Sequence, residues 1–231
     1  MSIIHVNQIK NHISRLFESK LDMSDAGNPD SRDYENQFLT RTLAAYAIHY
    51  LSGVDPINAA QAVTDGGEDN GIDAIFHHDS EKRLYLVQSK WIHDGVGEPS
   101  NGDMKKFISG IKDLFNMRFE RFNAKVNSKK TILTQVLNDP QSTYNVVVVY
   151  TGINSLAEPS QRDLDDLCEE MNDASEMLVV SKLNQTVLHA SLTARLAGEP
   201  INIDLGLKSW GKVDSPQMAF YGQIAASSIA E

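Results

Sequence analysis

The chain has little cysteine, no long apolar run and an excess of acidic over basic charge. Cys168 is the single cysteine among 231 residues, which excludes an internal disulfide and a metal site built from cysteines. Acidic neighbours such as Asp165 and Glu169 disfavour its thiolate and hence a nucleophilic role. No apolar run is long enough to span a bilayer, and the N-terminus lacks a signal-peptide core. We therefore expect a cytoplasmic protein without a membrane partner.

Composition sets the class of the protein. Hydrophobic residues make up 41% of the chain, which is typical of a globular protein, and the length suffices for a sizeable core. The net charge of -10 disfavours a protein dedicated to nucleic-acid binding, although a local basic stretch can still serve that purpose.

The most informative stretch runs from Asp65 to Trp91. An aspartate, Asp73, stands at the start of one apolar strand, and Gln88 and Lys90 stand at the end of the next. This spacing predicts a hairpin that brings a carboxylate, an amide oxygen and an ammonium to one point. Such a trio can hold a hard divalent cation beside a phosphodiester.

Strand periodicity supports that convergence. Residues two apart share a face of a strand, so Leu84, Leu86, Gln88 and Lys90 share one face while Tyr85, Val87 and Ser89 share the other. A strand that is apolar on both faces is buried, and polar groups at its end require partners. The alternative is structural: Lys90 pairs with a nearby acid and Gln88 caps a loop.

The pieces Asn70-Gly71-Ile72-Asp73 and Gln88-Ser89-Lys90 together resemble the PD-(D/E)xK nuclease superfamily, in particular its Mrr-type branch, where glutamine can replace the second acid. More narrowly, the chain is similar to the N-terminal part of the abortive-infection phage-resistance proteins called AIPR. The match is strongest from Tyr34 to Phe115 and thins through Val146 to Ala190. The departure from the acidic motif is Gln88, whose neutral oxygen binds a cation less strongly.

The resemblance implies a restriction-endonuclease-like domain over residues 1–195, followed by an extension over 196–231 that begins a further domain. It also implies a Mg²⁺- or Mn²⁺-dependent DNA endonuclease of phage defence, dimeric where both strands are cut. Asp73, Gln88 and Lys90 take the motif positions, and Glu35 is the best match for an auxiliary acid on a preceding helix; Asp73, Gln88 and Glu35 are the implied metal ligands.

Glu35 lies in a segment from Asp33 to Leu51 whose apolar residues recur at helical spacing. It borders the apolar face, so it can approach a site beside the sheet. An acid in the first turn of a helix is also favoured by the helix dipole alone, which leaves a purely structural role open.

The stretch from Asp103 to Lys130 holds eight basic residues against three acids, with aromatic and aliphatic residues at helical spacing. It predicts a basic amphipathic helix just after the site. Lys105, Lys106 and Lys112 are the candidate phosphate contacts, and a solvated face is the alternative. By contrast, 158–176 is acidic and predicts a surface facing solvent or a basic partner.

Other polar residues near the motif carry weaker signals. His77 and His78 follow the first strand and face opposite ways, so at most one can serve the site. Glu68 and Asp69 can supplement a metal shell, although loop acids are usually solvated. Trp91 can stack on a base or lie in the core.

The predicted order of elements indicates an α/β protein with a mixed central sheet flanked by helices. Helices are expected at 12–21, 33–51, 59–63, 131–138 and 160–173, and strands at 72–76, 84–90, 146–151 and 177–183, with a weaker apolar segment at 201–207. Three hypotheses follow: a metal-dependent endonuclease, a catalytically inactive nucleic-acid-binding module on the same fold, and an interaction domain that docks a partner.

Overall fold

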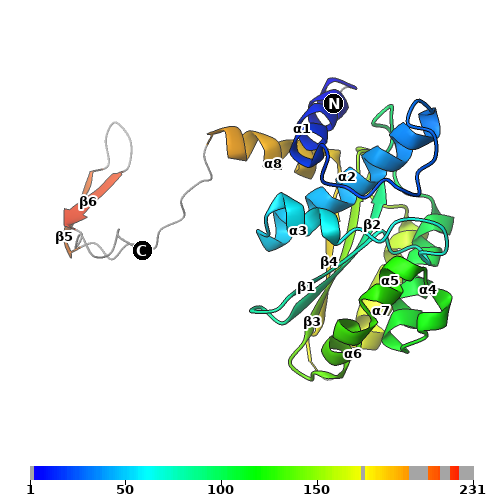
Figure 1. Cartoon of the computed structure of the whole chain (residues 1–231). Coiled ribbons are helices and arrows are strands. Elements are labelled where there is room, and N and C mark those ends of the chain that lie inside the picture. Colours follow the sequence, from blue (N-terminus) through cyan, green and yellow to red (C-terminus); the bar gives the residue numbers. More distant parts are fainter. Residues whose placement is uncertain (1–2, 173–174, 198–207, 214–218, 224–231) are drawn as a thin grey trace. The chain divides into compact units, whose positions relative to one another are not determined.

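The computed structural model describes residues 3–172, 175–197, 208–213 and 219–223 of the chain (Figure 1). The chain divides into two units, Met1–Thr193 and Ala194–Glu231, whereas the predicted domain ends at residue 195. None of the helices in the described ranges has both the length and the apolar character that crossing a bilayer requires.

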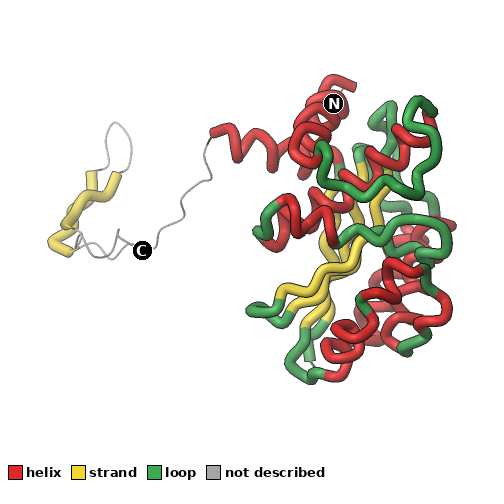
Figure 2. The backbone as a smooth tube through the Cα atoms, in the orientation of Figure 1, coloured by secondary structure: helices red, strands yellow, loops and turns green. Residues whose placement is uncertain are grey.

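A four-stranded sheet with the order β1-β2-β3-β4 forms the centre of the first unit (Figure 2). The strand β1 (Ala74–His78) pairs antiparallel with β2 (Arg83–Lys90). The strands β3 (Thr143–Tyr150) and β4 (Leu178–Leu183) then extend the sheet in parallel. Helices cover both faces (Figure 1), so the predicted α/β class with a mixed central sheet is confirmed.

One face of the sheet carries the helices α1 (Ile3–Phe17), α2 (Arg32–Ser52), α3 (Pro56–Gln61) and α8 (Gln185–Ala197). The middle of α2 is buried without a break from Arg41 to Ile48, because it lies between the sheet and the other helices of this layer. The hydroxyl of Ser31 caps its N-terminus by accepting from the N–H of Tyr34, and Gly53 ends it with a φ of 70°.

The other face carries α4 (Asn101–Phe115), the 3-10 turn η1 (Phe119–Arg121), α5 (Ala124–Ser128), α6 (Lys130–Asn138) and α7 (Glu158–Met171). Strand β2 separates the two cores. Its Tyr85 and Val87 side chains join the α2 side, and Leu84 and Leu86 join the α4 side, which confirms the predicted alternation.

The basic stretch differs from the prediction of one helix. The helix α4 ends at Phe115, and the chain turns through Met117, whose φ is 55°, before three short helical segments follow. Buried Asp113 explains the turn, since it accepts hydrogen bonds from the guanidinium groups of Arg118 and Arg121. The charges of these two arginines are thereby directed inward to one carboxylate.

The remaining differences concern the ends of the chain. The helix expected from residue 12 begins at Ile3, and α8 was not predicted at all. The apolar segment expected at 201–207 lies outside the described residues. The second unit contains an antiparallel pair of strands, β5 (Lys208–Val213) and β6 (Ala219–Gln223).

Candidate metal centre

A cleft of about 340 Å³ lies where β2 ends beside α2. The hairpin provides Asp73, Gln88, Ser89 and Lys90, and the residues just after β2 provide Trp91 and His93. The other lining residues are Asn36 and Thr40 of α2 and Asp65 of the loop before β1. All three residues of the sequence-predicted motif, Asp73, Gln88 and Lys90, therefore line one cleft.

The hairpin register places Asp73 against the end of β2. Ala74 pairs with Val87, and the N–H of Asp73 donates to the carbonyl of Val87 at 2.8 Å. The Oδ2 atom of Asp73 accepts from the N–H of Ser89 at 2.6 Å and from its hydroxyl at 2.8 Å. With its Oδ2 atom held in this way, the carboxylate has a defined orientation in the cleft.

Gln88 completes this arrangement, but not in the predicted way. Its Nε2 donates to Asp73 Oδ2 at 2.9 Å and to the carbonyl of Ser89 at 3.1 Å. The Asp73 carboxylate and the Ser89 carbonyl both accept hydrogen bonds, so the group of Gln88 that faces them is the amide nitrogen. The amide oxygen, Oε1, points away from them. Gln88 thus positions the Asp73 carboxylate. The amide oxygen of Gln88 does not lie beside that carboxylate, where it could share a metal ion with it.

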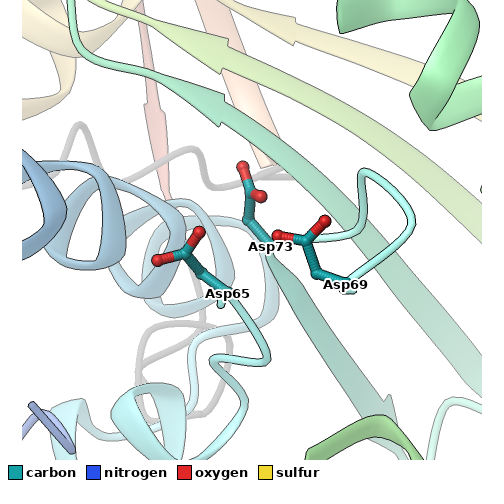
Figure 3. A group of neighbouring side chains, drawn as sticks. All are labelled: Asp65, Asp69 and Asp73. Carbon is teal, nitrogen blue, oxygen red and sulfur yellow. The ribbon is translucent and has the colours of Figure 1, made fainter. Parts of the chain in front are cut away.

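Two further carboxylates lie beside Asp73. Oxygen atoms of Asp65, Asp69 and Asp73 all lie within 4.8 Å of one another (Figure 3). Burial, followed by the charges of Asp65 and Asp69, raises the pKa of Asp73 well above its ordinary value. The donor set fits a hard divalent cation, since carboxylate oxygens are its preferred ligands and its charge would relieve the repulsion.

The loop before β1 brings these acids together through its backbone geometry. Glu68 and Asn70 have φ values of 59° and 54°, and Gly71 has a φ of 80°. The loop lies directly on α4, because a Cβ on Gly110 would come within 2.1 Å of the carbonyl oxygen of Asn70. A Cβ on Gly71 would likewise meet the backbone of Phe107 at 2.8 Å.

Basic side chains from two helices neutralise part of this charge. The guanidinium of Arg41, which is 1% exposed, donates to Asp65 at 2.8 Å and to both oxygens of Asp25 at 2.7 and 3.0 Å. Lys106 donates to Asp69 at 2.8 Å, and this bond raises the pKa of Lys106. Asp73 is the member of the three without an ion-pair partner among the described residues.

Lys90 reaches the cleft from the end of β2. Its side chain is 45% exposed, and its Nζ pairs with Asp103 of α4 at 2.9 Å. This contact is the structural pairing that the sequence left open as an alternative. Because the ammonium remains accessible, it can exchange Asp103 for an anionic ligand in the cleft.

The structure places Glu35 outside this cleft. Its carboxylate accepts a hydrogen bond from Lys10 of α1, which lowers the pKa of Glu35. It lines a separate hollow at the start of α2. The next residue, Asn36, occupies the cleft wall instead, and its side-chain oxygen lies 2.7 Å from Nε2 of His93.

The other predicted candidates are also located. Lys106 and Lys112 of α4 are ion-paired with Asp69 and Glu170, whereas Lys105 is exposed and has no ion pair in the described part of the chain. His77 and His78 lie at the far end of the hairpin, paired in register with Leu84 and Arg83. Trp91 is 8% exposed and belongs to the core, although it also lines the cleft.

Asp65, Arg41 and Ser89 were missed as contributors to the site. The spacing of Asp65, Asp69 and Asp73 at four-residue intervals was a visible signal for the first of them. No local pattern identifies Arg41, because its partner Asp65 is 24 residues away.

Comparison of the chain with family models, with curated proteins and with solved structures gives no match. The geometry of this cleft and the motif resemblance are therefore the observations that bear on function.

Proposed function

We propose that the chain is a divalent-metal-dependent endonuclease that hydrolyses phosphodiester bonds in DNA, and that it acts in the cytoplasm in phage defence. The single observation that carries this proposal is the shared cleft of Asp73 and Lys90. An acid before β1 and a lysine at the end of β2 converge there, beside two further carboxylates. Their order along a hairpin is the order of the PD-(D/E)xK motif that the sequence resembles.

The roles follow from the contacts. Asp73 would hold Mg²⁺ or Mn²⁺, with Asp65 and Asp69 within reach of the same ion. A cation bound there would polarise the phosphate and generate a water nucleophile. Gln88 and Ser89 orient the Asp73 carboxylate through their N–H and O–H groups.

Lys90 would supply positive charge where the phosphate becomes more negative in the transition state. Its ammonium is held by Asp103 at the mouth of the cleft and is close to half exposed, so a phosphate group can compete for it. Lys105 would provide an exposed phosphate contact on α4. Cutting of both strands of a duplex would require a second copy of the chain.

A catalytically inactive binding module is the second candidate, and one observation favours it. Gln88 stands where the PD-(D/E)xK motif normally supplies a second acidic ligand, and its amide nitrogen rather than its oxygen faces Asp73. Such a module would bind nucleic acid without cleaving it.

Plasmid cleavage in Mg²⁺, in Mn²⁺ and in EDTA separates the two candidates. We expect cleavage that EDTA abolishes, that Asp73→Ala abolishes, and that Lys90→Ala lowers by about 100-fold or more, as removal of a transition-state charge contact does in other enzymes. Lys20→Ala, which removes an exposed lysine outside the cleft, is the matched control and should retain the wild-type rate. Melting curves establish that each variant is folded.

Cleavage that survives EDTA, or Lys90→Ala cutting at the wild-type rate, would refute the mechanism. Binding of DNA by the wild type without cleavage in either metal would establish the inactive module instead. Gln88→Glu distinguishes the two further, because it restores an acid at the motif position. It should tighten metal binding, and it should leave cleavage intact or shift the preferred metal.

A further inference from the structure

A second cleft lies on the outer side of β1, between the end of α3 and the start of α6. Its volume is about 230 Å³. Ile75, Leu84 and Leu133 provide an apolar wall, and His77 and Lys129 provide polar groups. It shares no lining residue with the cleft that holds Asp73, so the two are separate sites.

The backbone of β1 is incompletely paired at this cleft. β1 is an edge strand of the sheet. Among the described residues its outer side is paired at its beginning, where Val63 bridges Ala74 and the N–H of Ile75 donates to the carbonyl of Ala62 at 2.9 Å. In an antiparallel ladder, the N–H and C=O groups of residues two apart point to the same side of the strand, so those of His77 point to the same side as those of Ile75. The N–H and C=O of His77 therefore face away from β2, toward the cleft, where an edge strand can pair with another extended segment.

Lys129 places a cation at the same cleft without a compensating anion. Its Nζ donates to the backbone carbonyl of Gln61 at 3.0 Å, across the gap between α6 and α3. Burial is the sole cause that lowers its pKa, and no carboxylate of the described residues pairs with it. Lys82, by contrast, pairs with the carboxylate of Asp139 at 3.0 Å. The Lys129 ammonium is thus partly desolvated and can accept an anionic ligand at little further cost.

We propose that this cleft binds the carboxyl-terminal end of an extended peptide whose last residue is apolar. The terminal carboxylate pairs with Lys129, the last side chain packs against Ile75, Leu84 and Leu133, and the peptide backbone pairs with the outward N–H and C=O of His77. Strand addition at a sheet edge combined with capture of a terminal carboxylate is a recurring mode of peptide recognition.

The size of the cleft agrees with a single side chain. Pockets for drug-sized ligands typically enclose about 300–1,000 Å³, so 230 Å³ accommodates less than such a molecule. A free monocarboxylate would use the ammonium and the apolar wall but not the strand edge. The edge therefore favours a peptide.

Fluorescence anisotropy with a short N-terminally labelled peptide that ends in leucine tests the proposal. We expect saturable binding that weakens roughly tenfold or more when the terminal carboxylate is replaced by an amide, because a charge-assisted hydrogen bond is lost. A peptide methylated on the backbone nitrogen that faces β1 should also bind more weakly. Lys129→Met should reproduce the effect of the amide, whereas Lys130→Met, the neighbouring exposed lysine, should bind as the wild type does.

Equal binding of the acid and the amide, or equal binding by Lys129→Met, would overturn the proposal, as would the absence of saturable binding. The proposal would also be overturned if hexanoate bound as tightly as the peptide and backbone methylation of the peptide had no effect. The site would then bind a small carboxylate rather than a peptide. Because the readout is peptide binding by the whole chain, it is independent of whether the protein cleaves DNA.

Discussion

Replacing Asp73 with asparagine removes one charge from three neighbouring carboxylates while keeping the shape of the side chain. The amide oxygen can take the place of Oδ2 and accept the hydrogen bonds from Gln88 and Ser89. The amide nitrogen then replaces the other oxygen and can donate to the remaining acids. Without a divalent cation, Asp73→Asn should therefore stabilise the protein.

The expected size follows from the spacing of the carboxylates. At the limiting separation of 4.8 Å, two unit charges repel by about 3 kcal/mol with an effective dielectric constant of about 20. Arg41 on Asp65 and Lys106 on Asp69 offset most of this repulsion. We expect a net gain of about 1–2 kcal/mol, which raises the melting temperature of a unit of this size by about 2–8 °C.

The gain should depend on pH. Burial raises the pKa of Asp73, so the folded protein binds this proton more tightly than the unfolded chain does. The wild type in EDTA therefore loses stability as the pH rises from the ordinary pKa of an aspartate through the raised pKa of the folded state. Asp73→Asn has no such proton to lose, so the difference between the two proteins should grow with pH over that range.

Thermal unfolding in EDTA from pH 4 to pH 8, repeated with excess Mn²⁺, measures both effects. Mn²⁺ should raise the melting temperature of the wild type, by an amount equivalent to about 2.7 kcal/mol at 100 times the dissociation constant, and Asp73→Asn should lose most of that gain. Asp166→Asn, which removes an exposed acid on α7, is the control. It should change neither the melting temperature in EDTA nor the gain that Mn²⁺ produces. If Asp73→Asn melts at a lower temperature than the wild type in EDTA at pH 8, the repulsion between these carboxylates does not destabilise the fold and the prediction is wrong.

Two further predictions concern the framework of the site. Arg41→Met should lower the free energy of unfolding by about 2–4 kcal/mol, slightly less than for a fully buried pair because its partner carboxylate on Asp25 is 41% exposed. Arg118→Met should cost less than about 1 kcal/mol, since Arg121 still pairs with the same acid, and urea unfolding compares the two. Gly110→Ala should destabilise by about 1–3 kcal/mol and weaken Mn²⁺ binding, because its Cβ collides with the loop that carries the aspartates. Gly102→Ala, whose Cβ would lie 3.7 Å from the nearest side chain, should leave metal binding unchanged in the same titration.

Local periodicity in the amino-acid sequence was enough to predict the strands and the hairpin of this protein. The alternation along Leu84 to Lys90 predicted a strand that separates two cores, and the run from Val146 to Val149 predicted a strand buried on both faces. The spacing of Asp73 and Lys90 predicted their meeting at one end of a hairpin. These predictions hold because side-chain direction in a paired strand follows from the count of residues alone.

Tertiary structure decided which charges face the cleft. Asp65 and Asp69 join Asp73 only because a loop with left-handed residues packs on α4, and the contact depends on Gly110. Glu35 lies outside the cleft because α2 turns Asn36 and Thr40 toward it, and Glu35 pairs instead with Lys10 of another helix. Charge pairing acts between groups that are far apart in the sequence, so it depends on how the helices pack and leaves no periodic signal in the chain.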